Sequence, residues 1–571
     1  MLLLSVALFA IIAKCSHEHP KLVLEILFDG FGEEKLRAYG GENMEKLPGL
    51  KMLIDRGVRF MDNSLSNYAS STSPGHVSTY TGSNPCDHGV IANYYRDEND
   101  EWAYSMYGGQ YNETGGVLVT QDKGKWKCGT APSRIIGTTT ADMHKRQFPE
   151  SKVFAVSVKD RSAIAGAGRE GIAYWMNDGR TILGINAKMI STQYYLEEYP
   201  QWVLDFQAAH PDDEFLDALW EAEYDMEEYR NKDNPRVDIF EGGYPRVDED
   251  FIFPKTYSNI HPKFKIFDET LATLAGNVKQ GPAGNVMLTQ FVKALIENEG
   301  IGQGNVPDYL TVSYGNPDYI EHFFGPRSVE AEDIIYKVDK ELKELLEFID
   351  DLIRLHNILI VFTADHGMTD IVEFSQNEGY NYAERVDFLG HFGPSILEEL
   401  NAKVLADFGI EILVPMADHA FGTNIYFNGA LGLTEEQIVE LEVYVANFLT
   451  TKSCISKAYA ASDIRRGLVS DQVVLNSFHS KRSGNVMVIE EAGANMMQDV
   501  YKKVGLRAAH GSRYTPDMNV PMIWAGPGVP KGKVVYRKTT NLDIATTLAA
   551  KVGTGVPTNA RGNVLEEVFE D

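Results

Sequence analysis

The chain has 571 residues, of which 44% are apolar and 23% are charged, so it contains enough apolar side chains for a large core and is not a disordered protein. Its 53 basic and 81 acidic residues give a formal net charge of −28. This charge argues against a nucleic-acid-binding or anionic-membrane-binding surface, because both need a basic face, but a small anionic substrate can still bind in one cleft.

The chain begins with an uncharged apolar run, Leu2 to Ile12. A transmembrane helix needs about 20 apolar residues, so this run predicts a signal peptide over residues 1–15 instead. Ala13 and Cys15 suit a cleavage site, and a lipid-modified Cys15 is an alternative. No other segment is apolar enough to span a bilayer, so we expect an exported protein, secreted or periplasmic.

Three cysteines remain after such a cleavage: Cys86, Cys128 and Cys454. At most one disulfide can form among them, and its pairing stays open. Cysteines are therefore not the scaffold of this fold.

Apolar runs that end in polar residues alternate with helical segments along the chain. A long helix is predicted over about residues 328–355, where apolar side chains recur at helical spacing. The alternation predicts an α/β fold with a mostly parallel central sheet and helices on both faces. The predicted strands are Leu22–Phe28, Val153–Val158, Tyr309–Tyr314, Ile358–Phe362 and Val520–Trp524.

Two stretches interrupt this alternation, at about residues 178–285 and 370–500. The first is rich in Tyr, Trp, Asp and Glu, and the second is mixed in composition. We interpret both as insertions into a single domain that covers residues 16–571.

Candidate metal ligands follow several predicted strands. In open parallel sheets the ligand site lies beyond the carboxyl ends of the strands. A single Asp there is most often a turn residue and a lone His is usually structural. The full set, however, offers three ligands for each of two zinc-like ions, which is the number that catalytic zinc takes. The set is Asp29, Asp318, His322, Asp365, His366 and His510, with Asp318 and His322 spaced to share one helical face.

A candidate nucleophile lies in Thr72-Ser73-Pro74-Gly75-His76. Pro74 suits a first helical turn, so Thr72 and Ser73 are expected at a helix N-terminus, where backbone N–H groups favour an anion. A Thr hydroxyl that also touches a metal can ionise near neutral pH and attack phosphorus. Taken locally, the same residues also fit a simple helix cap.

These motifs, in this order, resemble the alkaline phosphatase superfamily over nearly the whole chain. Besides the nucleophile segment they comprise Thr81-Gly82, His88-Gly89-Val90-Ile91-Ala92-Asn93, Asp318-Tyr319-Ile320-Glu321-His322, Thr363-Ala364-Asp365-His366-Gly367 and His510-Gly511. Val156-Ser157-Val158-Lys159-Asp160-Arg161 further resembles the segment by which the phosphate-irrepressible monoesterase branch contacts the phosphoryl oxygens.

The resemblance implies a role for each residue. One zinc would be held by Asp318, His322 and His510. The other would be held by Asp29, Asp365, His366 and the oxygen of Thr72. Thr72 would form a phosphothreonine intermediate, while the substrate phosphate would be bound by Asn93, the backbone N–H of Ser73, Lys159 and Arg161.

Two departures from the branch stand out: Ser73 replaces a frequent Gly, and Tyr314-Gly315-Asn316-Pro317 precedes Asp318 where a Ser/Thr-rich approach is expected. The resemblance implies an exported two-zinc phosphatase acting on small phosphate monoesters, with another divalent ion at one site left open. The alternatives are a phosphodiesterase or nucleotide pyrophosphatase of the same superfamily, and a non-catalytic secreted binding protein.

Overall fold

The computed structural model describes residues 19–569 except for gaps at 69, 98–100, 110, 113, 115–128, 178–187, 212–213, 216–217, 235–254, 257–277, 381–382, 389–394, 411–423, 428–431 and 498–506. The predicted signal peptide, residues 1–15, lies outside the described residues, as does Cys128. Cys86 and Cys454 are both free thiols.

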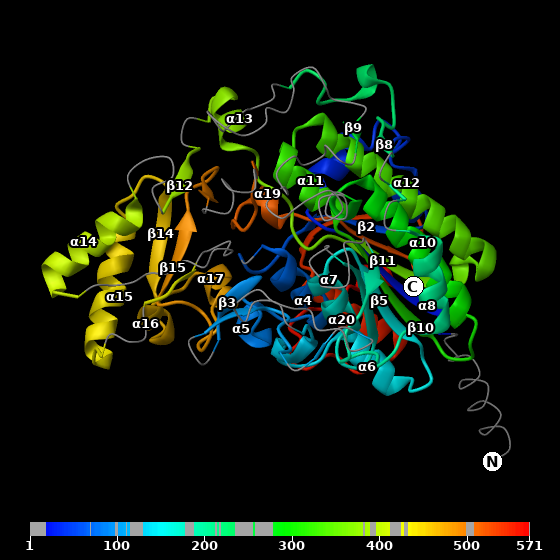
Figure 1. The fold of residues 1–571 in the computed structure, drawn as a ribbon, viewed down its shortest axis with the longest axis horizontal. Coiled ribbons are helices and arrows are strands. Elements are labelled where there is room, and N and C mark those ends of the chain that lie inside the picture. The colour runs from blue at the N-terminus through cyan, green and yellow to red at the C-terminus, as the bar shows by residue number, and fades with distance from the viewer. Residues whose placement is uncertain are drawn as a thin grey trace, which may run out of the picture.

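A nine-stranded sheet forms the centre of the molecule (Figure 1). Its strand order is β18-β2-β17-β11-β1-β10-β5-β6-β7. The bounds in that order are Lys533–Thr539, Gly57–Asn63, Met522–Ala525, Ile358–Thr363, Leu22–Phe28, Asp308–Tyr314, Val153–Ser157, Ile172–Met176 and Met189–Ile190.

The middle of the sheet is parallel, as predicted. β1 pairs in parallel with β10 and β11, and β5 continues this direction with β10 and β6. β17 runs antiparallel to both β11 and β2, and β7 runs antiparallel to β6. The carboxyl ends of β1, β10, β11 and β5 therefore meet at one edge, whereas β17 reaches that edge with its amino end.

Helices cover both faces of the sheet, which explains why all seven residues of β1 are buried. Alternate residues of β1 contact different cores: Leu24 and Ile26 face one layer of helices, and Val23 and Leu27 face the other. The first layer contains α2 (Glu33–Tyr39), α3 (Pro48–Arg56), α8 (Gln201–Ala209), α10 (Pro282–Glu299) and α12 (Val329–Leu352). The second contains α4 (Thr72–Thr81), α6 (Thr140–Gln147), α7 (Asp160–Ala167) and α20 (Leu542–Val552).

The predicted long helix corresponds to α12, which begins after Ser328. The Ser328 hydroxyl accepts a hydrogen bond from Ala331 N at 3.0 Å, which caps the helix.

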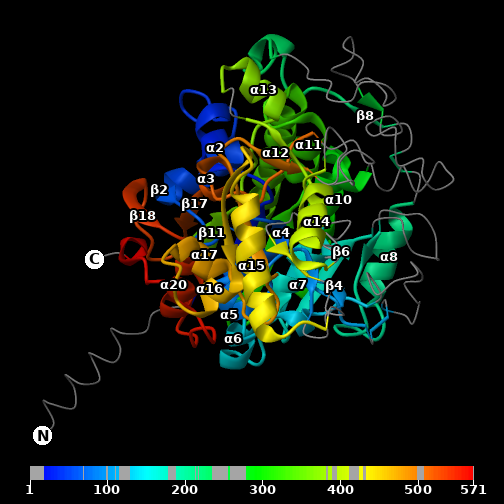
Figure 2. The ribbon, with the colours of Figure 1, turned by 90° about the vertical axis from the view of Figure 1, so that its left-hand side faces the viewer.

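The second predicted insertion contains a separate small core around Leu400, Val445 and Val488. It contains an antiparallel three-stranded sheet, β13-β15-β14, and forms the lobe around α14 and α15 at the left of Figure 1, which faces the viewer in Figure 2. Its elements are α13 (Val372–Asn377), β12 (Arg385–Asp387), α14 (Ile396–Phe408), β13 (Asn424–Ile425), α15 (Glu435–Leu449), β14 (Ile455–Ala460), α16 (Ala461–Arg465), α17 (Gln472–Ser477), β15 (Val486–Glu490) and β16 (Asn495–Met497).

Short elements complete the fold. β7 and α8, followed by the paired strands β8 (Leu219–Trp220) and β9 (Lys255–Thr256), lie in the first predicted insertion. The hairpin β3 (Tyr94–Arg96) and β4 (Trp102–Tyr104) follows α4 and α5 (Pro85–His88). Near the edge where the carboxyl ends of β1, β10 and β11 meet lie α11 (Asn316–Phe324) and α19 (Thr515–Met518).

Candidate active site

Three neighbouring strands deliver the predicted carboxylates to one edge of the sheet. Asp29 directly follows β1, Asp318 lies in the first turn of α11 just after β10, and Asp365 follows β11. Gly30 permits the close approach of the segment after β1 to the segment that carries Asp318. Its φ is +76°, and a Cβ there would lie 3.1 Å from the Cα of Asp318. Any larger residue would be strained and would push the two segments apart.

The six predicted ligands converge. Asp318, His322 and His510 each place one ligand atom within 4.8 Å of the others, and so do Asp29, Asp318 and His366. His366 Nε2 lies 3.4 Å from Asp365 Oδ2 and 3.5 Å from Asp29 Oδ1. The two predicted ligand sets therefore adjoin, with Asp318 next to both.

Backbone carbonyls set the tautomer of each predicted histidine ligand. The Nδ1 atoms of His322, His366 and His510 donate to Ala508 O, Gly367 O and Ser70 O at 2.8, 2.8 and 2.7 Å. Because Nδ1 carries the proton in each neutral ring, the Nε2 lone pair is directed elsewhere.

Those lone pairs face carboxylates. Nε2 of His322 and of His510 lies 3.3 and 3.5 Å from Asp318 Oδ1. Asp318 Oδ1, Asp29 Oδ1 and His366 Nε2 are buried, and none has a hydrogen-bond partner among the described residues. An arrangement of acceptors facing acceptors is unfavourable on its own and fits a divalent cation bound between them.

The carboxylates have opposite pKa shifts. Burial and the charge of Asp365 raise the pKa of Asp29. Burial acts in the same direction on Asp318, but Lys159 and the nearby histidines outweigh it and hold the pKa of Asp318 well below its usual range. Burial lowers the pKa of His322 and His510, which keeps both rings neutral and able to bind a metal.

Thr72 is the first residue of α4, in agreement with its predicted place at a helix N-terminus, and is almost fully buried. Two cations donate to its hydroxyl oxygen: Lys159 Nζ at 3.4 Å and Arg161 Nη2 at 3.3 Å. Lys159 Nζ also contacts Asp29 Oδ2 at 2.8 Å and Asp318 Oδ2 at 2.5 Å. The hydroxyl, both cations and the carboxylate cluster thus form one continuous site.

Asn93 lies directly before β3 and beside the start of α4. The backbone N–H of Ser73 donates to Asn93 Oδ1 at 2.9 Å. The resemblance assigned this N–H to a phosphoryl oxygen, but here it orients the Asn93 amide. The Ser73 side chain, which replaces a frequent Gly, is fully buried and pairs with Ser105 Oγ at 2.7 Å.

Several supporting residues were not assigned a role from the sequence. His76 Nδ1 lies 2.9 Å from Thr72 O and 3.1 Å from Asp365 Oδ2, which links the nucleophile segment to a predicted ligand. Lys35 pairs with Glu321 and donates to Gly30 O at 2.8 Å. His76 belongs to the quoted nucleophile motif, which was therefore a sequence signal for it. No sequence signal pointed to Lys35, because its charged partner, Glu321, is 286 positions away.

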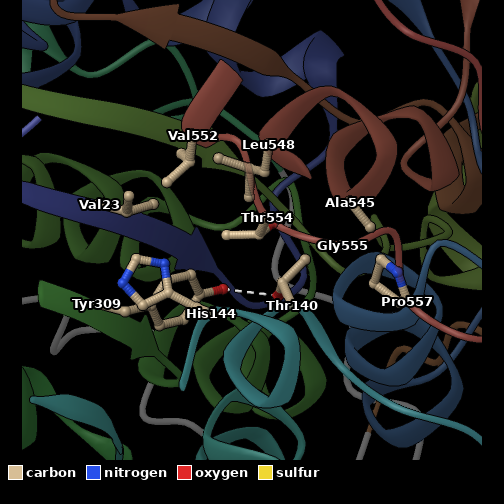
Figure 3. A pocket seen from close by; sticks show the side chains of 10 residues that line it. All are labelled: Val23, Thr140, His144, Tyr309, Ala545, Leu548, Val552, Thr554, Gly555 and Pro557. Atoms are coloured by element: carbon tan, nitrogen blue, oxygen red, sulfur yellow. Dashed lines mark hydrogen bonds between the residues drawn. The ribbon is translucent and has the colours of Figure 1, made fainter. Parts of the chain in front are cut away.

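A small pocket lies elsewhere, between α6, α20, β1 and β10 (Figure 3). Val23 and Tyr309, the second residues of two parallel strands, line it, and Tyr309 Oη lies 2.7 Å from Thr140 Oγ1. The pocket is therefore near the amino ends of these strands, whereas the candidate ligands lie beyond their carboxyl ends.

The chain has relatives of similar length. A protein named calcium-transporting ATPase from Myroides odoratus is 27% identical, over 98% of this chain and 97% of that protein. Alkaline phosphatase PafA from Elizabethkingia meningoseptica is 26% identical, over 96% and 94%. Alkaline phosphatase PhoV from Synechococcus elongatus is 25% identical, over 96% and 93%. Within the described part of the chain, no helix combines the length and apolarity that crossing a bilayer requires.

Solved structures share the fold. The crystal structure of alkaline phosphatase PafA superposes with a TM-score of 0.80 at 23% identity, over 97% of this chain and 100% of that one. Murine ectonucleotide pyrophosphatase/phosphodiesterase 5 gives a TM-score of 0.53 at 12% identity, over 96% and 100%. Both confirm the predicted alkaline-phosphatase-like α/β fold.

The sequence model of the type I phosphodiesterase/nucleotide pyrophosphatase family matches residues 23–513. This range includes every predicted metal ligand and the nucleophile segment. The chain belongs to the type I phosphodiesterase/nucleotide pyrophosphatase family, within the alkaline phosphatase superfamily that its motifs resemble.

Proposed function

We propose that the protein is an exported, two-zinc phosphatase that hydrolyses small phosphate monoesters through a phosphothreonine on Thr72. The family match and the names of the two alkaline phosphatase relatives support a phosphate-ester hydrolase. Export rests on the signal peptide predicted at residues 1–15.

The observation that carries the monoester assignment is the pair of cations at Thr72 Oγ1. Lys159 and Arg161 both lie within 3.4 Å of this oxygen. A monoester brings nearly two negative charges to the nucleophile, whereas a diester brings one and a second ester arm. Two cations within reach of one oxygen favour the dianion and its transition state.

The donor set fits zinc, because imidazole nitrogen and carboxylate oxygen are the ligands that zinc takes in hydrolytic sites. We assign one ion to Asp318, His322 and His510, and the other to Asp29, Asp365, His366 and Thr72 Oγ1. When bound, such ions supply Lewis-acid stabilisation of the nucleophile and of the leaving oxygen.

The side chains then perform two displacements. Thr72 Oγ1 gives its proton to solvent and attacks phosphorus, the ester oxygen leaves with its electron pair and takes up a proton from solvent, and phosphothreonine forms. Water then attacks phosphorus and gives up a proton, the bond to Oγ1 breaks, Oγ1 is protonated again, and phosphate is released. Asn93 and Arg161 hold the phosphoryl oxygens, and Lys159 stabilises charge beside the leaving oxygen.

A direct test compares an aryl phosphate with a bis-aryl phosphate diester on zinc-loaded protein, with zinc counted on the same sample. We expect faster monoester turnover, about two zinc ions per chain and loss of activity to a chelator. Lys159→Ala and Arg161→Ala should reduce monoester turnover far more than diester turnover. Arg327→Ala, which removes an exposed pair with Asp370, is the matched control.

Faster diester turnover would reject the monoester proposal and favour the second candidate, a phosphodiesterase, which the family description itself supports. Equal losses on both substrates in the two variants would remove the charge argument. A protein that binds no zinc and hydrolyses neither ester would instead fit a secreted binding protein.

A further inference from the structure

We propose that Tyr104, the last residue of β4, and Ser105, which follows it, are positioning residues. They fix the relative positions of three segments: the start of α4, the loop with Asn93 and the turn with Arg161. The inference deepens the proposed function, since it assigns phosphate to Asn93 and Arg161. Neither Tyr104 nor Ser105 would contact the substrate; each would act through a residue that does.

Ser105 connects the nucleophile segment to Asn93. Its Oγ pairs with Ser73 Oγ at 2.7 Å, and its backbone N–H donates to Asn93 O at 2.9 Å. Both serine side chains are fully buried, so water does not compete for this bond. The pair therefore ties the second residue of α4 to the loop that precedes β3.

The same contacts orient the Asn93 amide. Ser73 N is a donor, so the Asn93 atom that faces it at 2.9 Å must be the acceptor Oδ1. With Oδ1 held in this way, Nδ2 is the atom left to donate to a phosphoryl oxygen. A displaced Ser73 would release the amide to rotate and present its oxygen, which repels phosphate.

Tyr104 makes the third connection. Its hydroxyl donates to Asp160 Oδ1 at 2.7 Å. Asp160 is the first residue of α7 and stands between Lys159 and Arg161 in the sequence. The adjacent residues Tyr104 and Ser105 thus connect the β3–β4 hairpin both to the turn that carries Lys159 and Arg161 and to α4.

Such ties matter because a misplacement of about 1 Å at a reacting centre costs on the order of 100-fold in rate. Asn93 and Arg161 must bind the same phosphate from segments of two different sheets, since Asn93 precedes β3 of the hairpin and Arg161 follows β5 of the central sheet. The dipeptide that joins them fixes their separation. We therefore expect the loss of either bond to weaken phosphate binding without removing any phosphate ligand.

The test measures binding of inorganic phosphate to the zinc-loaded protein by calorimetry, so it does not depend on which ester the enzyme prefers. Ser105→Ala and Tyr104→Phe should each weaken binding by about 3- to 10-fold, the value of one buried hydrogen bond. Ser105→Ala should have little further effect in an Asn93→Ala background, and Tyr104→Phe little further effect in an Arg161→Ala background.

Two control variants separate positioning from general stability. Ser191→Ala removes a buried hydroxyl that donates to Ala173 O at 2.7 Å, and Tyr39→Phe removes one that donates to Pro326 O at 3.1 Å. Both should lower the melting temperature about as much as the test variants and leave phosphate affinity unchanged.

The inference is overturned if the test variants bind phosphate like the wild type, if their effects are fully additive in every background, or if the wild-type protein binds no phosphate. A preference for diesters in turnover would reject the proposed function alone, because the coupling in phosphate binding would remain.

Discussion

Lys35→Met should destabilise the protein and weaken metal binding at the same time. Lys35 pairs with Glu321, and the two side chains are 3% and 0% exposed. Lys35 Nζ also donates to Gly30 O at 2.8 Å. Gly30 follows Asp29, and Glu321 precedes His322, so this one ammonium joins the segments that carry the two predicted ligand sets.

The magnitude follows from burial. Removing one partner of a buried ion pair leaves an uncompensated charge and costs about 3–5 kcal/mol. In Lys35→Met/Glu321→Leu no charge remains, and the main cost is the unpaired Gly30 carbonyl, about 1–3 kcal/mol. The double variant should therefore be more stable than Lys35→Met. Because both segments end at ligands, zinc affinity should fall by about 10- to 100-fold in the single variant.

Urea unfolding of the chelator-treated protein measures the stability change without metal, and competition with a zinc indicator measures the affinity. Lys51→Met, which removes an exposed pair with Asp55, is the matched control and should change neither. A Lys35→Met protein as stable as the wild type, or a double variant less stable than the single one, would refute the reasoning.

Glu25→Gln should remove a pH dependence of stability. Burial raises the pKa of Glu25 from 4.5 to about 7, although hydrogen bonds from Tyr309 and Thr140 act in the opposite direction. Between these two pH values the unfolded wild-type chain loses the Glu25 proton while the folded protein keeps it, so the wild type becomes less stable as the pH rises. Glutamine carries no such proton, so between about pH 5 and about pH 8 the free energy of unfolding of the variant, measured with urea, should rise by about 3 kcal/mol relative to that of the wild type. A difference that stays constant with pH would contradict this. Arg482, in the second predicted insertion, donates to Gly89 O at 2.6 Å and to Arg134 O at 2.8 Å, and Arg482→Met removes both hydrogen bonds. Its free energy of unfolding should fall by about 2–4 kcal/mol with zinc content unchanged, and an unaltered unfolding midpoint would count against this role.

Local patterns predicted the middle of the sheet well. The mainly apolar run Leu22–Phe28 coincides with β1, because a strand covered on both faces buries every side chain; its one charged residue, Glu25, is buried with a hydrogen bond from Tyr309. β18 was missed, since only two of its seven residues are buried and its apolar run, Val534–Tyr536, is only three residues long. The direction of β17 was also beyond local patterns, because all four of its residues are buried and such a strand gives the same apolar run in either direction.

Local sequence likewise predicted one part of the candidate site and not another. Residue type and spacing were enough to select Asp318 and His322, because one helical turn separates them. No pattern indicated that Ser73 would pair with Ser105, or that its N–H would face Asn93 instead of remaining open to phosphate.

The amino-acid sequence by itself indicated the strands in the middle of the sheet, the candidate residues for metal binding and for attack on phosphorus, and their order along the chain. The tertiary structure alone decided their partners: Lys35 meets Glu321 across 286 positions, and Ser73 meets Ser105 across 32. The physical reason is that burial and side-chain chemistry belong to each residue and its neighbours. A hydrogen bond between distant segments depends instead on how the whole chain crosses the sheet.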